Sequence, residues 1–435
     1  IIGLSGLITP SLEEMQYVAG EMQKDDYFRA RQMPLMIGGA TTSRVHTAVK
    51  IAPHYEGPVV YVPDASRSVS VAQGLLSDQA ATYIAELNAD YERVRTQHGN
   101  KKPVVLWSLD KARANRTPID WAGYVPPKPK FIGKRIFRNF DLAELARFID
   151  WGPFFQTWDL AGPYPATLQD EVVGEQARKV FADGQAMLQR LIDGRWLSAS
   201  AVIGLYPANA VNDDDIELYT DETRSQVALT WHGLRQQTEK HEIDGPDGKP
   251  FMRPSRCLAD FVAPKGTADD YVGVFAVTAG LGVEKKEQAF IDAHDDYSAI
   301  MLKSLADRLA EAFAECLHHR VRTDLWGYAP QETLSPEDLI AEKYTGIRPA
   351  PGYPACPDHS VKRAMFELLQ CGDIGMGLTE SLAMTPAASV SGFMLSHPQS
   401  TYFNVGKIGE DQLMAQASRR AMPPAELRRL LASNL

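Results

Sequence analysis

The chain has 435 residues, a formal net charge of −10 and 44% hydrophobic residues. That length exceeds what one ordinary hydrophobic core serves, so we expect more than one domain. The acidic balance argues against nucleic-acid binding, which needs a basic face, and no apolar run approaches the ~18 residues of a membrane span. The four cysteines have no paired short spacing, which argues against a disulfide framework or a zinc ribbon and favours a reduced, cytoplasmic protein.

Short apolar runs alternate with helical patterns over residues 1–96. The runs "IIGLSGLI", "MPLMIGG" and "GPVVYV" are predicted strands, and the first predicted helix is capped by Ser11 with Glu14 as its capping-box partner. This alternation is typical of a parallel sheet, whose ligands bind outside the carboxyl ends of the strands. The candidate binding residues at those ends are Ser5, Thr9, Gly38, Gly39 and Ala65.

Two features of this first domain bear on its interpretation. The pair Gly38-Gly39 suits a close backbone approach to a ligand, but a plain strand-to-helix turn is the alternative interpretation. The chain opens inside a strand pattern and has no basic segment before it, so we expect a fragment of a longer protein and no signal peptide.

The pattern changes after a predicted linker at residues 97–129, which ends in the proline-rich "VPPKPK". Residues 130–435 carry long helical patterns before and after a block of strand-like runs, including "SAVIGLYPA", "DIELYT", "SQVALTWHG" and "YVGVFAVTA". Strands in a block predict an α+β domain with an antiparallel sheet. The clearest helix runs from Tyr297 to about Arg322, where Leu305, Leu309, Phe313 and Leu317 recur at intervals of four.

The segment "GIRPAPGYPACPDH" (346–359) holds four prolines and cannot be a helix interior or a central strand. Arg348 offers a planar fork to a carboxylate, and Tyr353 offers an aromatic face to a cation such as a sulfonium. The prolines would stiffen the loop before any ligand arrives. A rigid structural crossover is the alternative interpretation.

Two other segments have a similar character. "FIDWGPFFQTWDL" places Asp150 among aromatic residues, where an acid is either paired or functional. "SVSGFMLSHPQSTYFNVGKI" places Tyr402 and Phe403 at a predicted strand start. An acid, an arginine and several aromatic residues suit a zwitterionic ligand with a sulfonium group. The histidines of "CLHHR" (316–320) and "DAHDDY" (292–297) predict no metal site, and the latter is interpreted as the charged entry of the long helix.

Several of these motifs together resemble the cobalamin-dependent methionine synthases. The resemblance is carried by "DWGPFF", "RQQTEK", "CLADFVAP", "HDDYSAIM", "LKSLADRLAEAFAE", "WGYAP", "GIRPAPGYPACPDH" and "ASVSG". It implies most of a cobalamin-binding α/β domain over residues 1–96, of the parallel-sheet Rossmann or flavodoxin-like class and incomplete at its start. It also implies an α+β activation domain over residues 130–435 that binds S-adenosylmethionine and donates its methyl group to reactivate oxidised cobalamin.

The resemblance also implies site residues and partners. Those implied to contact S-adenosylmethionine are Asp150, Arg348, Ala350, Tyr353, Tyr402 and Phe403, with Glu311 as a further contributor. Those implied to contact the nucleotide tail of cobalamin are Ser5, Thr9, Gly38, Gly39 and Ala65. A flavodoxin or related reductase is the implied electron donor, and the remaining N-terminal domains of the enzyme are the implied further partners. The loop with the axial histidine, and the homocysteine domain with its zinc, lie outside this sequence, so we expect no tight cobalamin binding by this chain alone.

Two other functions remain open at this point. The chain could be a corrinoid carrier that docks separate methyltransferases and has no catalytic role of its own. It could instead be a flavodoxin-like regulatory domain fused to an interaction domain, in which case the chain would not bind S-adenosylmethionine and replacing Arg348 would have no effect.

Overall fold

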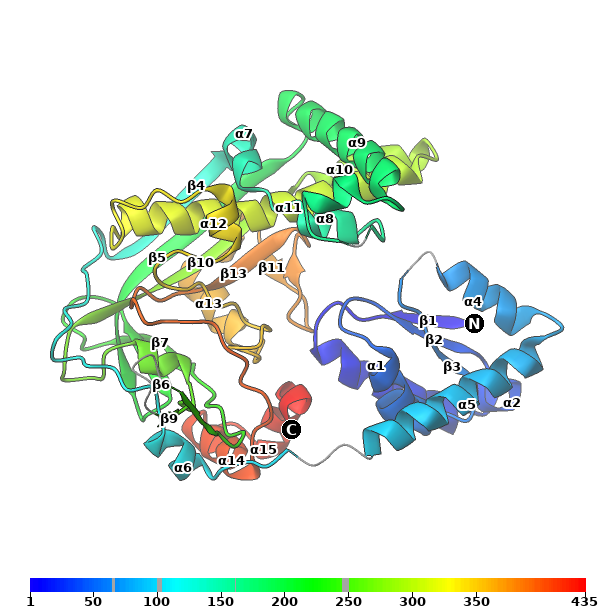
Figure 1. The fold of residues 1–435 in the computed structure, drawn as a ribbon, viewed down its shortest axis with the longest axis horizontal. Helices are drawn as coiled ribbons and strands as arrows, with labels where there is room; N and C mark the ends of the chain where they lie inside the picture. The colour runs from blue at the N-terminus through cyan, green and yellow to red at the C-terminus, as the bar shows by residue number, and fades with distance from the viewer. Residues whose placement is uncertain (65–66, 100–103, 161, 245–249) are drawn as a thin grey trace. The chain divides into compact units, whose positions relative to one another are not determined.

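In a computed structural model, described for residues 1–64, 67–99, 104–160, 162–244 and 250–435, the chain divides into two compact units (Figure 1). Unit 1 comprises Ile1–Trp107 and Lys407–Leu435, and unit 2 comprises Ser108–Gly406. This grouping differs from the predicted ranges at three places. Of the predicted linker, residues 97–107 belong to unit 1 and residues 108–129 to unit 2. Residues 407–435, predicted with the second domain, group with unit 1.

The first unit contains the predicted parallel sheet. Its strands are β1 (Ile2–Ser5), β2 (Leu35–Gly38) and β3 (Val59–Tyr61), paired in the order β1-β2-β3 and all parallel. The helices are α1 (Pro10–Lys24), α2 (Asp26–Arg31), α3 (Arg44–His46), α4 (Arg67–Leu76), α5 (Ala80–Gly99), α14 (Glu410–Arg419) and α15 (Pro424–Leu430). Short π- and 3₁₀-turns follow at Thr47–Ile51, Ala52–His54 and Ala432–Asn434.

The predicted cap of the first helix is wrong. Helix α1 begins at Pro10, so Ser11 lies inside it, and Thr9 occupies the cap position without a side-chain hydrogen bond to the backbone. Proline is well suited to the first helical position, because its fixed φ fits the helix and its missing N–H has no intrahelical partner there. The proline therefore decides where the helix starts.

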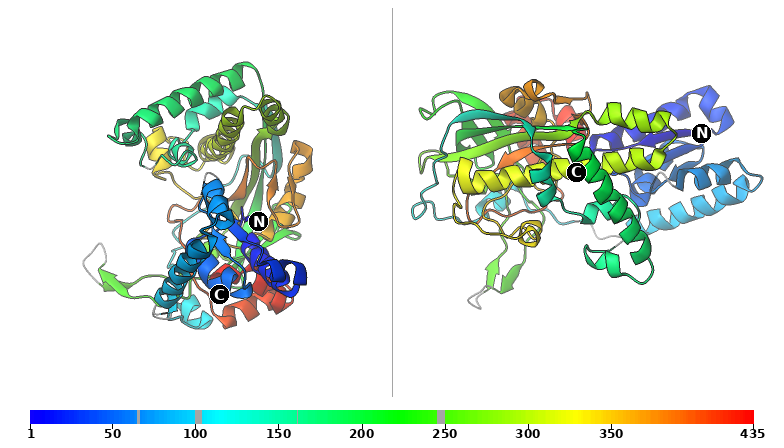
Figure 2. Two further views of the ribbon diagram at one scale, coloured as in Figure 1. Left: turned by 90° about the vertical axis from the view of Figure 1, so that its right-hand side faces the viewer. Right: turned by 90° about the horizontal axis from the view of Figure 1, so that it is seen from above.

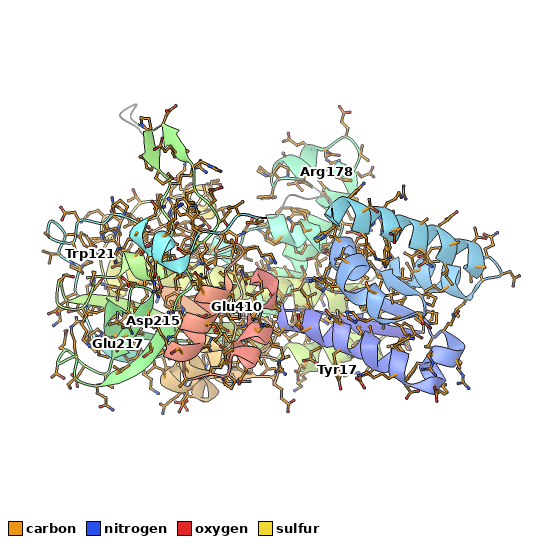
Figure 3. All side chains as sticks on the ribbon, turned by 90° about the horizontal axis from the view of Figure 1, so that it is seen from below. Tyr17, Trp121, Arg178, Asp215, Glu217 and Glu410 are labelled. Atoms are coloured by element: carbon orange, nitrogen blue, oxygen red, sulfur yellow. The ribbon has the colours of Figure 1, made fainter. Side chains whose placement is uncertain are left out.

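The second unit is built on a six-stranded antiparallel sheet. Its strands are β4 (Gly133–Phe140), β5 (Ser198–Val211), β6 (Asp215–Tyr219), β7 (Val227–His232), β10 (Asp270–Leu281) and β13 (Ser389–Met394). The order is β13-β10-β5-β6-β7, with β4 also paired to β5. Two small hairpins accompany the sheet: β8 (Glu242–Asp244) with β9 (Pro250–Met252), and β11 (Gly377–Leu378) with β12 (Met384–Thr385). The β8–β9 hairpin projects from this unit (Figures 2 and 3).

Helices cover both faces of this sheet. They are α6 (Leu109–Ala114), α7 (Leu142–Leu145), α8 (Gly152–Gln156), α9 (Gly174–Asp193), α10 (Val283–Asp292), α11 (Asp296–Arg320), α12 (Pro336–Ile340) and α13 (Val361–Leu369). Single turns of 3₁₀-helix lie at Ala146–Phe148, Ala166–Gln169, Leu258–Phe261 and Cys371–Ile374, and a π-turn at Val321–Leu325 extends α11. The long helix α11 starts as predicted, with the Asp295 carboxylate accepting the Ser298 N–H at 3.0 Å.

Alternation along the central strands separates two cores. In β5, Ala201 and Ile203 belong to the core that contains α9 and α11, whereas Val202 and Ala208 belong to the core that contains α13. This division follows from the period of two in a strand, which sends successive side chains to opposite faces. A central strand with both faces buried reads as a continuous apolar run, as "SAVIGLYPA" does. Among the described residues, no helix combines the length and the apolar character that crossing a membrane requires.

Candidate functional site

The proline-rich segment predicted as a binding loop runs along the free edge of the sheet in unit 2. Ile347 and Leu395, the residue after β13, exchange two backbone hydrogen bonds of 2.9 Å, and the Phe393 N–H donates to the Pro349 carbonyl at 2.9 Å. The segment is thus held on both sides of Arg348 as an extra edge strand. A Cβ at Gly392 would lie 2.7 Å from the Pro349 oxygen, so the glycine permits this close approach.

The next residues form a turn with hydrogen bonds of its own. The Gly352 N–H donates to the Cys356 carbonyl at 2.8 Å, and the Cys356 N–H donates to the Tyr353 carbonyl at 2.9 Å. Gly352 has a φ of +98°, and a Cβ there would lie 2.1 Å from Cε1 of buried His359. A second loop is attached to this turn, because the Val405 N–H donates to the Pro354 carbonyl at 2.9 Å. Tyr402 and Phe403 lie in that second loop, and the predicted strand start at these residues is wrong.

A cavity of about 510 Å³ lies between these loops, the sheet and α11. It is lined by Phe275, Glu311, Glu342, Arg348, Pro349, Ala350, Tyr353, Pro354, Ala355, Val390, Tyr402, Phe403 and Asn404. The structure therefore brings together five of the six residues predicted to bind the ligand, together with Glu311. Its size is in the range of small-molecule sites, and its lining combines apolar surface with a few charged groups.

The sixth predicted residue, Asp150, lines an adjoining cavity of about 360 Å³. The two cavities share four lining residues, Glu311, Glu342, Arg348 and Tyr353. One carboxylate oxygen of Asp150 accepts the Gly152 N–H at 2.9 Å, at the start of α8. The acid among aromatic residues is thus partly satisfied by the backbone, and its second oxygen has no hydrogen-bond partner in the described part of the chain.

Arg348 is held by an acidic residue that lines the smaller cavity, Glu315, and by polar residues that line neither cavity. Its Nη2 lies 2.7 Å from Oε2 of Glu315, which is 8% exposed and one helical turn after Glu311 on α11. A second ion pair adjoins the first. Nε and Nη2 of buried Arg322 donate to the Glu332 carboxylate at 2.8 to 3.0 Å, and Nη2 of Arg322 also lies 3.6 Å from Oε1 of Glu315. Burial opposes the charged guanidinium of Arg348, but Glu315 outweighs it and raises the pKa of Arg348 above its usual range. The arginine is permanently cationic.

Neutral groups fix the other end of the guanidinium. Nη1 of Arg348 donates to the Tyr344 hydroxyl at 3.0 Å and lies 3.3 Å from Nδ1 of His318. Burial, and then the charges of Arg322 and Arg348, lowers the pKa of His318 well below its usual range, so this imidazole is neutral. Because an arginine only donates, Nδ1 must accept and Nε2 must carry the proton toward the Tyr328 hydroxyl at 3.1 Å. Nε of Arg348 has no hydrogen-bond partner within the described residues, which leaves a donor for a ligand.

Several carboxylates line the cavities together with this arginine. Glu311 and Glu342 line both, and Asp150 and Glu315 line the smaller one. The charge of Glu311, followed by burial, raises the pKa of Tyr353, which is 59% exposed and shares both cavities with it. A site with one free arginine edge, several carboxylates and an accessible aromatic ring suits a ligand with one anionic and more than one cationic group.

In unit 1, three of the predicted residues meet where β1 and β2 end. Ser5 and Gly38 are the last residues of β1 and β2 and are paired in register, and Gly39 follows directly. Gly39 has a φ of +104°, and a Cβ there would lie 2.4 Å from the backbone of Gly6. The close approach of the two backbone segments therefore requires a glycine at position 39.

The fourth predicted residue, Thr9, stands at the start of α1, and Ala65 lies outside the described residues. Leu7, between Ser5 and Thr9, is 61% exposed, so an apolar side chain is presented at the strand end. Such a surface fits a large, partly apolar group. No cluster of three or more histidine, cysteine or acidic side chains able to hold a metal ion occurs among the described residues of either unit.

Sequence reasoning missed several residues of the site. Glu342, Phe275 and Val390 line the larger cavity, and Glu315 lines the smaller one. His318 and Tyr344 line neither cavity but contact Arg348. The spacing of Glu311 and Glu315 on α11, one helical turn apart, could have indicated a shared face. Nothing in the sequence indicates that β10 and β13 bring Phe275 and Val390 to the same cavity, because that depends on strand pairing.

Comparisons with known proteins agree with this architecture. Residues 141–421 match the family model described as "Vitamin B12 dependent methionine synthase, activation domain". The chain is similar to a crystal structure of the MetH reactivation domain bound to AdoHcy, with 50% sequence identity and a TM-score of 0.71. The similarity covers 76% of this chain and 98% of the other.

Proposed function

Because the chain belongs to the family of vitamin B12-dependent methionine synthase activation domains, we propose that unit 2 binds S-adenosylmethionine and presents its methyl group for reactivation of oxidised cobalamin. The family is one of methyltransferases, and the domain is part of a multidomain enzyme. The observation that carries the proposal is the cavity of about 510 Å³ lined by Arg348, Ala350, Tyr353, Tyr402 and Phe403, with Asp150 in the cavity beside it. The complete enzyme would methylate homocysteine with methyltetrahydrofolate as donor.

The charges of the site give each residue a role. The free edge of Arg348 binds the ligand carboxylate, and the unpaired oxygen of Asp150 accepts the α-amino group. Glu311, Glu342 and the ring of Tyr353 surround the sulfonium. The apolar part of the lining, with Pro349, Val390 and Phe403, takes the adenosyl group.

Unit 1 supplies the other half of the proposal. Ser5, Thr9, Gly38 and Gly39 would hold the nucleotide tail of cobalamin at the carboxyl ends of the strands, the position where parallel sheets bind ligands. Once reduced by one electron from a flavodoxin or related reductase, the bound cofactor would supply the nucleophile for the methyl group of S-adenosylmethionine, with S-adenosylhomocysteine as the leaving group. The residues of the chain orient the donor and exclude water. The four cysteines are free and buried, which fits a reducing compartment, and we place the protein in the cytoplasm.

The test is calorimetric titration of the 435-residue chain with S-adenosylmethionine. We expect saturable one-to-one binding that Arg348→Ala weakens by about tenfold or more, because a charged hydrogen bond is lost. Arg178→Ala is the matched control, since Arg178, labelled in Figure 3, is exposed and lines neither cavity. A folded wild-type chain that binds nothing would contradict the proposal and leave the carrier function.

A second titration tests the role of Asp150. Asp150→Asn should weaken binding of S-adenosylmethionine more than binding of its deaminated analogue, because only the former has the α-amino group. Equal losses for both ligands would remove Asp150 from that group and leave it as the cap of α8.

A further inference from the structure

One buried tyrosine connects two residues of the proposed binding site without lining either cavity. The Tyr344 side chain is 7% exposed and belongs to neither set of lining residues. Its hydroxyl nevertheless lies 3.0 Å from Nη1 of Arg348 and 3.2 Å from the hydroxyl of Tyr402, and both of those residues line the larger cavity.

These contacts close a ring of hydrogen bonds around the arginine. The Arg348 backbone N–H donates to the Tyr402 hydroxyl at 2.9 Å, the Tyr402 and Tyr344 hydroxyls are bonded to each other, and Nη1 of Arg348 donates to Tyr344. Both ends of the long arginine side chain are thus tied to the same pair of hydroxyls. A flexible side chain pinned at its backbone and at its tip has few rotamers left.

The tyrosine itself is held in place by its ring. The guanidinium of Arg322 lies 4.4 Å from the ring centroid, and the ring of His318 meets it edge-on at 5.0 Å. Burial raises the pKa of Tyr344, so the hydroxyl keeps its proton and remains both a donor and an acceptor. Its oxygen therefore holds a fixed position, from which it is hydrogen-bonded to both Arg348 and Tyr402.

We propose that Tyr344 is a positioning residue: its hydroxyl orients the guanidinium of Arg348 to receive the carboxylate of S-adenosylmethionine, without touching the ligand. This inference rests on the proposed function. Glu315 alone cannot set this orientation, because it contacts a single nitrogen, Nη2, about which the guanidinium can still pivot. At Nη1 the Tyr344 hydroxyl, at 3.0 Å, is the nearer of two contacts, the other being Nδ1 of His318 at 3.3 Å, and it removes that freedom.

The experiment compares two ligands and four proteins. S-adenosylmethionine and its decarboxylated analogue are titrated into the wild-type chain, Tyr344→Phe, Arg348→Ala and the double variant. Tyr344→Phe deletes one oxygen and keeps the ring. It should weaken binding of S-adenosylmethionine by about tenfold, but binding of the decarboxylated analogue by less than about twofold. The double variant should bind no more weakly than Arg348→Ala, because residues that act through one another are not additive.

Tyr271→Phe is the matched control. Tyr271 is also buried and also loses one side-chain hydrogen bond, to Glu222, but it lines neither cavity. It should leave both affinities unchanged.

Four outcomes would overturn the positioning role. Equal losses for both ligands, additive losses in the double variant, or loss of the wild-type thermal transition in Tyr344→Phe would make the hydroxyl a general stability element. Unchanged affinity in Tyr344→Phe, with Arg348→Ala impaired, would refute this inference alone. A folded wild-type chain that binds neither ligand would refute the proposed function instead.

Discussion

The two units differ in how deeply their ion pairs are buried. The ion pairs of unit 1, such as Lys24 with Glu21 and Arg44 with Asp90, join side chains that are partly or largely exposed. Unit 2 buries whole networks, including Arg235, which is fully buried and lies 2.7 Å from Asp214 and 2.8 Å from Asp260. Exposed pairs contribute little to stability, whereas a buried charge that loses its partner is costly. Unit 2 is therefore the unit in which a single charge substitution affects the fold.

The units also build their candidate sites differently. In unit 1 the candidate residues stand at the ends of paired strands, where their position follows from strand register. In unit 2 they stand on irregular loops that cross a sheet edge, and hydrogen bonds and ion pairs fix their positions. Irregular segments can be as well fixed as strands when their backbone groups are bonded to the sheet.

The largest expected effect tests the charge comparison directly. Arg235→Met should lower the free energy of unfolding of unit 2 by about 3–5 kcal/mol, because Asp260 becomes a buried carboxylate without its cation. Asp90→Asn should lower the free energy of unfolding of unit 1 by less than about 1 kcal/mol. Urea titrations of both variants, followed by tryptophan fluorescence and circular dichroism, measure the difference. Similar losses in the two variants would show that burial does not distinguish the two kinds of pair.

The next effect compares two glycines. Gly39→Ala should destabilise unit 1 by about 2–4 kcal/mol, since its φ of +104° and the backbone of Gly6 both oppose a side chain. It should leave binding of S-adenosylmethionine unchanged. Gly352→Ala should instead abolish most binding, because the new methyl group meets the ring of His359 beneath the turn. Calorimetric titration together with thermal unfolding separates the two results, and intact binding by Gly352→Ala would contradict the need for this turn.

Acid should act on unit 2 through its buried histidines. Burial lowers the pKa of His359 and of His397 to about 4. Between pH 6.5 and 4 these groups gain protons only in the unfolded chain, so stability falls as the pH falls through this window. Asp270 opposes the effect, because burial raises its pKa to about 6 and favours the protonated native form in acid. These three groups together give a net loss on the order of 2–3 kcal/mol, and buried His318, whose pKa is also lowered, adds to the loss.

The measurement is the urea midpoint of unit 2 at about pH 6.5 and about pH 4.5, on either side of most of this titration. His397→Asn should reduce the difference between the two midpoints. A midpoint that rises on acidification would show that Asp270 outweighs both histidines.

The smallest expected effect concerns the stiffness of the binding loop. Pro351→Gly should weaken binding of S-adenosylmethionine by about two- to fivefold, because the unliganded loop has more conformations to lose on binding. It should change the free energy of unfolding without ligand by less than about 1 kcal/mol. Titration and thermal unfolding of the same variant give both values. A large loss of unliganded stability with unchanged affinity would favour a purely structural crossover.

The fold was largely predictable because its signals are local. The three strands of unit 1, the antiparallel block of unit 2 and the long helix α11 all follow from apolar patterns of period two or 3.6. The start of α1 was mispredicted because Pro10 decided it rather than the Ser11 capping pattern. Residues 108–129 lack a periodic pattern, and nothing local indicates that Trp326 donates to the Pro127 carbonyl at 2.7 Å and so joins this segment to unit 2.

The candidate site was predictable only in part. Arg348, Tyr353 and Asp150 stand in segments of unusual composition, and that composition alone marks them as candidates. Glu315 and Tyr344 stand in ordinary sequence, and their importance depends on contacts made across the fold. The paired state of Arg348 was also not foreseeable, because it depends on how α11 packs against the loop.

The attachment of the segment Ile347–Pro349 to β13 also concerns solubility. An uncovered edge strand offers free N–H and C=O groups to other chains, and this segment occupies those groups on β13. Detaching it would expose a template for intermolecular pairing at the moment that the binding site is lost. Variants that fail because the segment detaches should therefore precipitate on storage, whereas Arg348→Ala should lose its ligand and remain in solution.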